Sequence, residues 1–423
     1  MISSNAVSPG SPASVQKRWV VCALLFAATT INYMDRQILG ILAPLLEREI
    51  GWNEIEYGHI VTAFQAAYAI GLLGFGRLLD TVGTRLGYAI SVALWSLAAM
   101  AHALASSIVG FGAARFALGL GEAGNFPAAV KAVAEWFPVR ERALANGIFN
   151  SGANVGAILA PAIVPWLTSS WGWRTAFLAL GAIGFGWLAL WWGIYETPGH
   201  TAQPMATVGA TPLDPTDRIQ WRRLLAHRQT WACIAAFGLT APVWWFYLYW
   251  IPKFLCSRHG LELAALGPPL IVIYTMTCVG SIGGGWLSSA LLHRGFSTNL
   301  SRKLAMLACA CCVLPVCLAP GARDLWTTTS LVGLAAAAHQ GWAANLFAVV
   351  ADLFPKRAVA SAVALGVMAG SLSSMAFSQA AGWILQTTGS YWTLFAFAAA
   401  AYPMALALMH SLCPRLEIAL LEK

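Results

Sequence analysis

The sequence predicts an all-α membrane protein of twelve transmembrane helices, arranged as two pseudo-symmetric halves of six helices each. Three observations predict this fold class. Hydrophobic residues make up 58% and charged residues only 10% of the 423 residues, against roughly 45–50% and about 25% in soluble domains. Uncharged runs long enough to cross a bilayer separate the charged residues, and one motif recurs in both halves.

The uncharged runs give the expected spans directly. Residues 358–413, for example, contain no Asp, Glu, Lys or Arg. A spanning helix needs about 20 apolar residues, whereas the alternating strands of a membrane barrel take only about ten, so we expect helices. The predicted spans are 19–46, 59–79, 86–107, 109–131, 143–168, 173–195, 230–255, 267–292, 303–321, 325–351, 358–385 and 391–413.

One long polar loop divides the spans into six and six. It covers 196–229, carries four prolines, and ends in a basic amphipathic stretch typical of an interfacial helix. The predicted organisation is a disordered cytoplasmic tail (1–18), an N-terminal six-helix bundle (19–195), a cytoplasmic linker with an amphipathic helix (196–229), a C-terminal six-helix bundle (230–413) and a second cytoplasmic tail (414–423).

The positive charges indicate the orientation in the membrane. Most of the 25 Lys and Arg residues lie on loops that share a side with the N-terminus, which predicts that both termini are cytoplasmic. The net charge of +8 is therefore explained by topology, and we expect no nucleic-acid partner. The polar, Ser- and Pro-rich segment at 1–16 does not have the pattern of a cleaved signal and is expected to be a disordered tail. The expected location of this multi-pass chain is the bacterial inner membrane.

The two halves resemble each other in sequence. Residues 134–138 (Ala-Glu-Trp-Phe-Pro) after the fourth span recur as 351–355 (Ala-Asp-Leu-Phe-Pro) after the tenth. Further matches pair Gly147 with Gly366 and Trp173 with Trp392. Matched halves are typical of transporters in which one half rocks against the other around a central site.

Four ionisable residues lie within apolar spans: Asp35 and Arg36 in the first, Arg115 and Glu122 in the fourth. A charge at the bilayer centre costs at least ~2.5–3.5 kcal/mol, so these groups should face one another or a wet cavity. Arg115 and Glu122 are two turns apart, or ~10 Å along one helix face, which is too far for a direct salt bridge.

The residue types suggest a division of roles among these four. Arg36, whose planar guanidinium matches a carboxylate, is the expected ligand of the substrate carboxylate. Asp35 and Glu122 could take up and release protons, while Arg115 neutralises one of them for part of the cycle. The alternative is a static ion-pair network that fixes helix packing.

A loop motif adds a family resemblance. Residues 76–85 (Gly-Arg-Leu-Leu-Asp-Thr-Val-Gly-Thr-Arg) resemble the signature between helices two and three of the major facilitator superfamily. The resemblance implies the twelve-helix fold and a gating latch made by Asp80 and Arg85. The matching stretch of the second half has Ser289 where an acid would stand.

Other stretches resemble the anion:cation symporter family and, within it, hexuronate transporters. They are 32–36, 115–127, 250–254, 280–286 and 338–340. The resemblance implies proton-coupled uptake of a small organic anion such as glucuronate or galacturonate by a monomer, with the acids of helices one and four carrying protons. Symport of a hexonate or aldarate (galactonate, glucarate), or exchange of an organic anion for phosphate, remains open.

Polar and aromatic residues within the spans complete the expected substrate site. They are Tyr33, Tyr68, Gln65, Asn150, Asn154, Trp245, His339, Gln340 and Ser373. Each could instead serve helix packing, and a lone histidine such as His339 is more often structural than part of a relay. The resemblance places substrate contacts near Tyr33, Tyr68 and Asn154.

Several other functions are disfavoured. A membrane enzyme would need a nucleophile, a metal cluster or a phosphate loop, and none is recognisable, so no cofactor or metal is expected. Phosphate exchangers use an arginine in each half, but the seventh span has only Lys253 at its end. Gly152 and Gly156 form a small-xxx-small face that predicts close helix approach.

Overall fold

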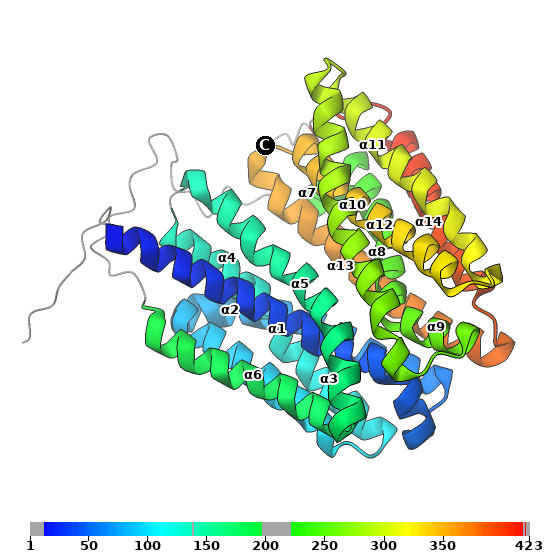
Figure 1. The fold of residues 1–423 in the computed structure, drawn as a ribbon. Coiled ribbons are helices and arrows are strands. Elements are labelled where there is room, and N and C mark those ends of the chain that lie inside the picture. Colours follow the sequence, from blue (N-terminus) through cyan, green and yellow to red (C-terminus); the bar gives the residue numbers. More distant parts are fainter. Residues whose placement is uncertain (1–11, 138, 197–220, 418, 420–423) are drawn as a thin grey trace, which may run out of the picture. The chain divides into compact units, whose positions relative to one another are not determined.

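The computed structural model describes residues 12–137, 139–196, 221–417 and 419, and every regular element among them is a helix. Figure 1 traces these helices along the chain. They are α1 (Pro12–Ile50), α2 (Glu54–Ala101), η1 (His102–Leu104), α3 (Ile108–Glu122), α4 (Asn125–Trp136), α5 (Val139–Trp171), α6 (Trp173–Ile194), α7 (Trp221–Leu225), α8 (Arg228–Tyr249), α9 (Ile251–His259), η3 (Leu263–Ala265), α10 (Gly267–His293), α11 (Thr298–Val313), η4 (Leu314–Gly321), α12 (Leu325–Leu353), α13 (Lys356–Thr388) and α14 (Trp392–Leu412).

Ten segments of the described chain are long and apolar enough to cross a membrane. They correspond to ten of the twelve predicted spans. The other two predicted spans coincide with α1 and with α3 followed by α4. α1 carries Asp35 and Arg36, which lower its apolar character, whereas α3 and α4 have only 15 and 12 residues and are each shorter than the roughly 20 that span a bilayer.

The loop motif between the second and third spans contains a glycine that the backbone requires. Gly83 has φ +82° and ψ 166°, a non-helical conformation that interrupts α2 near the start of the segment Thr81–Leu104. Residues with a side chain rarely adopt a positive φ, whereas glycine does so readily. The sequence separates these two spans at 79–86, and the structure puts the break within that interval.

The predicted fourth span is not one continuous helix. It is divided into α3 and α4, which are 15 and 12 residues long, with the break at Ala123 and Gly124. Pro127 has no N–H to donate to the carbonyl of Ala123, and its ring disfavours a continuous helix there. Glu122 is therefore the last residue of α3, directly before the break.

The described residues belong to two compact units. The first lies within Met1–Ile38, Ala66–Ala160 and Ser170–Pro212, and the second within Leu39–Gln65, Pro161–Ser169 and Leu213–Lys423. The end of α1 and the start of α2 thus pack with the later helices. Most of the predicted linker, 197–220, lies outside the described residues, so the division at 196–229 stays a prediction.

Glycines bring helices together within each unit. In the first unit, a side chain at Gly152 or Gly156 of α5 would collide with the backbone of α1, which agrees with the predicted small-xxx-small face. In the second unit, Gly280 and Gly284 of α10 contact the backbone of α12 in the same way. Helices in membranes associate largely through such close packing.

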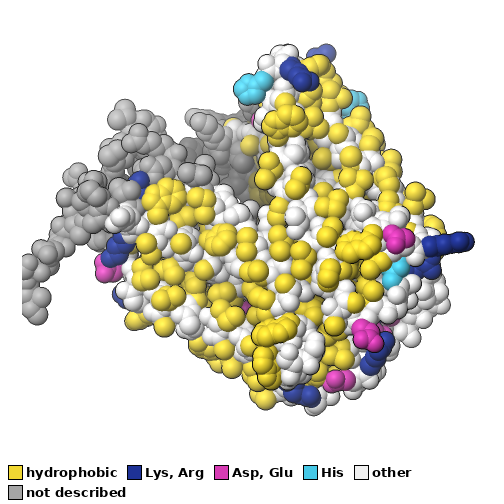
Figure 2. Space-filling view, viewed as in Figure 1, with side chains coloured by type: hydrophobic (Ala, Val, Ile, Leu, Met, Phe, Trp, Pro, Cys, Tyr) yellow, Lys and Arg dark blue, Asp and Glu magenta, His cyan; other side chains and the backbone are white. Residues whose placement is uncertain are grey.

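Large apolar side chains cover much of the surface. On α10, Ile282 and Trp286 are 75% and 67% exposed, on a different face from the glycines that contact α12. In water, exposed apolar area of this extent is unusual for a monomer. Hydrophobic side chains cover most of the described face in Figure 2, and charged side chains lie mainly near its edges. This surface suits a lipid environment.

Candidate substrate and proton site

The first unit contains a buried ion pair between two of the predicted site residues. Arg36 on α1 donates from Nη2 and Nε to Glu122 Oε2 on α3, at 2.8 and 3.0 Å. The side chain of Glu122 is fully buried, and that of Arg36 is 7% exposed. Because both bonds go to one oxygen, Glu122 Oε1 has no hydrogen-bond partner among the described residues.

Aromatic rings frame the Arg36 guanidinium. Its Cζ lies 4.8 Å from the ring centre of Tyr33 and 5.0 Å from that of Tyr68. Arg36 Nη2 also donates to Asn32 Oδ1, at 3.4 Å, one turn earlier on α1. Cation–π contacts and a hydrogen bond from the same helix hold the charged group in one orientation. The sequence predicted the two tyrosines as site residues but did not single out Asn32.

Arg115 lies beside this pair on α3 and is fully buried. Its Nη2 donates to the backbone carbonyl of Arg36, at 3.1 Å. The sequence proposed Arg115 as a partner of Glu122 or Asp35, but the ion pair observed at Glu122 is made by Arg36. Arg115 thereby links α3 to the backbone of α1 at the position of the substrate-binding candidate.

Asp35 precedes Arg36 on α1 and is only 1% exposed. Neither carboxyl oxygen has a hydrogen-bond partner among the described residues. Taking an unpartnered ionised carboxylate out of water is very costly, and such groups are normally paired or neutral. The site thus holds two buried acids in different settings, one bonded to an arginine and one without a hydrogen bond.

Buried hydrogen bonds join other helices to both sides of the break between α3 and α4, next to Glu122. Ser91 of α2 donates to the carbonyl of Gly121, at 2.7 Å, just before the break. Asn125, the first residue of α4, accepts a hydrogen bond from Tyr88 at 2.6 Å and donates to Thr29 of α1. These buried bonds tie α1, α2 and both sides of the break together. The sequence did not predict this network, although Gly124 and Pro127 mark its position.

Two predicted residues of the second unit lie in aromatic clusters. His339 on α12 stacks on Trp244 of α8, with ring centres 5.3 Å apart, and its Nδ1 lies 2.7 Å from the Tyr402 hydroxyl. Trp245 stacks on Tyr249 at 5.6 Å. Both side chains are thus held by neighbours within their own unit.

The remaining substrate candidates lie on α2, α5, α12 and α13. Gln65 Oε1 accepts from Ser378 of α13 at 3.3 Å, and Ser373 donates to the carbonyl of Gly370 on its own helix. Gln340 is partly exposed on α12. On α5 in the first unit, Asn150 is exposed and Asn154 partly exposed.

The predicted latch is described for one member only, because the side chain of Asp80 lies outside the described residues. Arg85 donates to the Trp192 carbonyl at 2.6 Å and covers the Trp192 ring. Nearby, Glu135 of the repeated motif accepts from Thr84 and Tyr195. In the second copy of the motif, Asp352 accepts from Arg302 at 2.9 Å.

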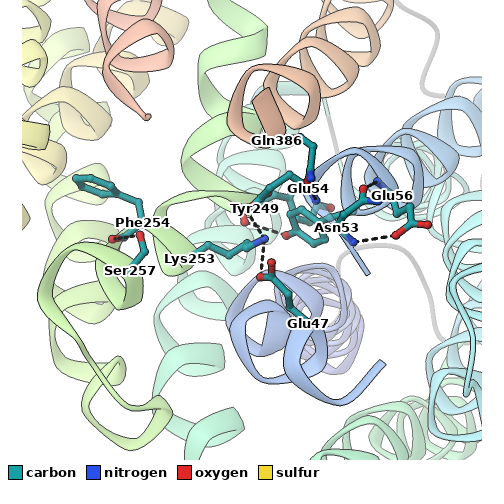
Figure 3. A network of polar contacts seen from close by, with 10 residues as sticks. Glu47, Asn53, Glu54, Glu56, Tyr249, Lys253, Phe254, Ser257 and Gln386 are labelled. Carbon is teal, nitrogen blue, oxygen red and sulfur yellow. Dashed lines mark hydrogen bonds and ion pairs between the residues drawn. The ribbon is translucent and has the colours of Figure 1, made fainter. Parts of the chain in front are cut away.

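A second charged cluster lies in the other unit, between the end of α1, the start of α2 and the start of α9. Lys253 Nζ is 2.8 Å from Glu47 Oε2 and 2.7 Å from Glu54 Oε1, as Figure 3 shows. Lys253 also lies over the Tyr57 ring, and Tyr57 donates to the Tyr249 carbonyl at 2.8 Å. The sequence singled out Lys253 as the only basic residue of its span but gave no role to the two acids.

Comparison with known proteins identifies relatives of this chain. Residues 25–378 match the family model described as Major Facilitator Superfamily. The hexuronate transporter of Escherichia coli (strain K12) is 31% identical over 392 residues, which cover 88% of each chain. The galacturonate transporter of Dickeya chrysanthemi is 31% identical over 329 residues, covering 74% of this chain and 92% of that protein.

Solved structures show the same fold. A bacterial homolog of the human lysosomal transporter Spinster, in an inward-facing and unoccupied conformation, matches with a TM-score of 0.75 at 19% sequence identity. The match covers 96% of this chain and 99% of that one. At this level of identity the likeness concerns the fold alone.

Proposed function

Because the chain belongs to the Major Facilitator Superfamily, we propose that it takes up a small organic anion together with protons by alternating access. Membership makes the protein a membrane transporter and not an enzyme. The proposed substrate is a hexuronate such as glucuronate or galacturonate. The proposed location is the bacterial inner membrane, with both termini cytoplasmic and the monomer as the working unit.

The observation that carries this proposal is the buried Arg36–Glu122 pair. The guanidinium of Arg36 lies over the rings of Tyr33 and Tyr68. A guanidinium can bind the carboxylate of a sugar acid, and the rings can pack against the sugar. Arg36 Nη2 and Nε both donate hydrogen bonds to Glu122. A substrate carboxylate that binds Arg36 must therefore compete with Glu122.

Protonation of Glu122 would resolve this competition. A neutral carboxyl group loses its charge-assisted bonds to Arg36, which becomes available to the substrate anion. Release of the substrate would return Arg36 to Glu122 as the proton leaves. Anion and proton are then bound together and released together, which is the condition for symport.

Asp35 offers a second place for a proton. Its carboxyl group is buried beside Arg36 and has no hydrogen-bond partner among the described residues. Without a partner, its ionised form is expensive unless Arg115 or water compensates it. We assign Asp35 to proton coupling and Arg115 to compensating charge near Arg36, whose backbone it contacts.

The substrate class is supported by the names of the relatives. Hexuronate and galacturonate transporters are each 31% identical to this chain, and a D-galactonate transporter of Escherichia coli O6:H1 is 27% identical over 405 residues. Hexuronates are thus preferred, with hexonates and aldarates as alternatives. Exchange against phosphate is less favoured, because the seventh predicted span contributes no arginine, only Lys253 at its end.

Uptake into proteoliposomes tests the proposal. The panel is glucuronate, galacturonate, galactonate, glucarate and glucose, each with and without an imposed proton gradient that is acidic outside. We expect concentrative uptake of one or more sugar acids only when the gradient is present. Equal uptake of glucose, or accumulation that ignores the gradient, would contradict the anion or the proton part of the proposal respectively.

A further inference from the structure

A cavity lies beside Lys253 in the second unit. It is formed by the end of α1, the start of α2, α9 and the turn between α13 and α14, and has a volume of about 690 Å³. This is within the roughly 300–1,000 Å³ of small-molecule sites. Lys253, Glu47 and Glu54, whose contacts Figure 3 shows, are among the residues that line it.

The charges that line the cavity are not balanced. Three cations and two carboxylates face it: Arg48, Lys253, Arg258, Glu47 and Glu54. Lys253 forms ion pairs with both carboxylates. Neither arginine forms an ion pair within the described part of the chain. Arg258 donates instead to the Ala322 carbonyl, at 3.2 Å. Two arginine side chains with uncompensated charge thus line the opening.

The two bonds of Lys253 differ in their exposure to the cavity. The side chain of Lys253 is 5% exposed, that of Glu54 is 18% exposed, and that of Glu47 is 34% exposed. An ion pair exposed on one side is weakened by water and salt. The Glu47 bond is therefore the one that an anion from solution can replace, because a new carboxylate at Lys253 would restore the charge balance.

The geometry points to a binding site for a small hydroxycarboxylate anion in this cavity, which competes with Glu47 for Lys253 and is attracted by Arg48 and Arg258. Ser257, Ser390, Tyr391 and Trp392 also line the cavity. Hydroxyl-bearing and aromatic side chains suit the hydroxyls and the apolar face of a sugar acid. The choice of a sugar acid rests on the proposed function, whereas the charges and the cavity do not.

This site is separate from Arg36, which lies in the other unit. Occupation would exchange one of the two carboxylates that hold Lys253 to α1 and α2. The anion would thereby loosen the junction between α1 and α9 as it binds. We place the site on the outer side of the membrane, where it would concentrate substrate before transport.

Binding to the purified full-length protein in detergent tests the inference. The probe is galacturonate, observed by saturation-transfer NMR, with glucose as the neutral control. The double variant Arg36→Gln/Glu122→Gln removes the proposed transport site at Arg36, called the inner site below. Because both charges are removed together, neither is left buried without its partner. We expect this variant to retain weak galacturonate binding, with a dissociation constant on the order of 1 mM.

Two further changes in that background locate the binding. The double change Arg48→Ala/Arg258→Ala should raise the dissociation constant for galacturonate about tenfold or more. Each exposed ion pair between an arginine and the anion changes that constant by up to about fivefold. The matched control is Arg323→Ala, because Arg323 is also exposed but does not line the cavity. Glu47→Gln should tighten binding by up to about fivefold, because it removes the competitor for Lys253, an effect that a purely structural salt bridge would not produce.

The outcomes separate this inference from the proposed function. If the wild type transports galacturonate but the inner-site variant binds none, the cavity site is refuted and the transport proposal stands. If the wild type transports no sugar acid but arginine-dependent galacturonate binding persists, the cavity site stands alone. Binding that ignores Arg48 and Arg258, or that Glu47→Gln weakens, also overturns the inference.

Discussion

Arg36 and Glu122 are bonded through a single carboxylate oxygen, with Arg36 Nη2 and Nε 2.8 and 3.0 Å from Glu122 Oε2. The pair is buried between α1 and the end of α3. A guanidinium can offer two parallel N–H groups to the two oxygens of one carboxylate, and that arrangement is not used here. If Arg36 binds the substrate as we propose, a substrate carboxylate that accepts both parallel N–H groups would therefore form a better bond than Glu122 does.

The first prediction concerns the shape of this cation. Arg36→Lys keeps the positive charge but loses the planar fork and its contacts with the rings of Tyr33 and Tyr68. We expect uptake of the preferred sugar acid to fall at least about tenfold, or ~1.4 kcal/mol. The measurement is initial uptake by proteoliposomes containing equal amounts of protein.

The matched control is Arg174→Lys, because Arg174 is exposed and contacts only the face of Trp173 among the contacts described for it. That variant should transport like the wild type. Unchanged uptake by the Arg36→Lys variant would remove Arg36 from substrate binding.

The second prediction concerns Asp35 as a proton carrier. Asp35→Asn keeps the size of the side chain but cannot ionise. We expect it to abolish accumulation driven by the proton gradient, while exchange of labelled for unlabelled substrate survives, since exchange does not require deprotonation. Because neither Asp35 oxygen has a hydrogen bond to a described residue, the change should barely affect folding. Normal gradient-driven accumulation by this variant would exclude Asp35 from coupling.

The third prediction concerns the packing of α5 on α1. A Cβ at Gly152 would lie 2.5 Å from the Phe26 carbonyl oxygen and 3.0 Å from Thr30 Oγ1. Gly152→Ala should therefore destabilise the protein by ~1–3 kcal/mol, as overpacking does. Gly147, five residues earlier on the same helix, has no neighbour within 4 Å of such a Cβ, so Gly147→Ala should be neutral or slightly stabilising. Thermal unfolding of both variants in one detergent compares them, and equal melting temperatures would contradict the packing described here.

Helix positions and the buried charges could be predicted from the sequence, because apolar runs and rare intramembrane charges are properties of short segments. The break after Glu122 was missed, since the stretch around Gly124 and Pro127 is apolar enough to pass for one span. The sequence also could not predict which arginine forms the ion pair with Glu122. Helical spacing shows that Arg115 cannot reach Glu122 along α3, but it cannot show that Arg36, 86 residues away, does.

The Lys253 cluster illustrates the same limit in the second unit. Lys253 and Glu54 are 199 residues apart, and only the packing of α9 against α1 and α2 brings them together. Each residue alone has the pattern of an ordinary charge at the end of a span. Their mutual bonding depends on tertiary contacts, which no local pattern records.

The last prediction separates a working proton site at Glu122 from a static ion pair. Glu122→Gln resembles the protonated acid and releases Arg36 from its charged partner. If protonation of Glu122 prepares Arg36 for substrate, the variant should bind sugar acid with an affinity that depends less on pH than that of the wild type. It should nevertheless fail to concentrate the substrate, because the proton step is lost. Binding at several pH values and accumulation in proteoliposomes measure the two effects.

If Glu122 only balances Arg36, the same change leaves a buried cation without its ionised partner, and breaking such a pair typically costs ~3–5 kcal/mol. The variant should then insert or unfold abnormally, and a lower melting temperature would accompany any loss of transport. The double variant Arg36→Gln/Glu122→Gln distinguishes the two cases, because removing both charges should restore the stability of a static pair but not transport. A stable Glu122→Gln protein with full accumulation and wild-type pH dependence would eliminate both roles, since neither the proton nor the charge of Glu122 would then be needed.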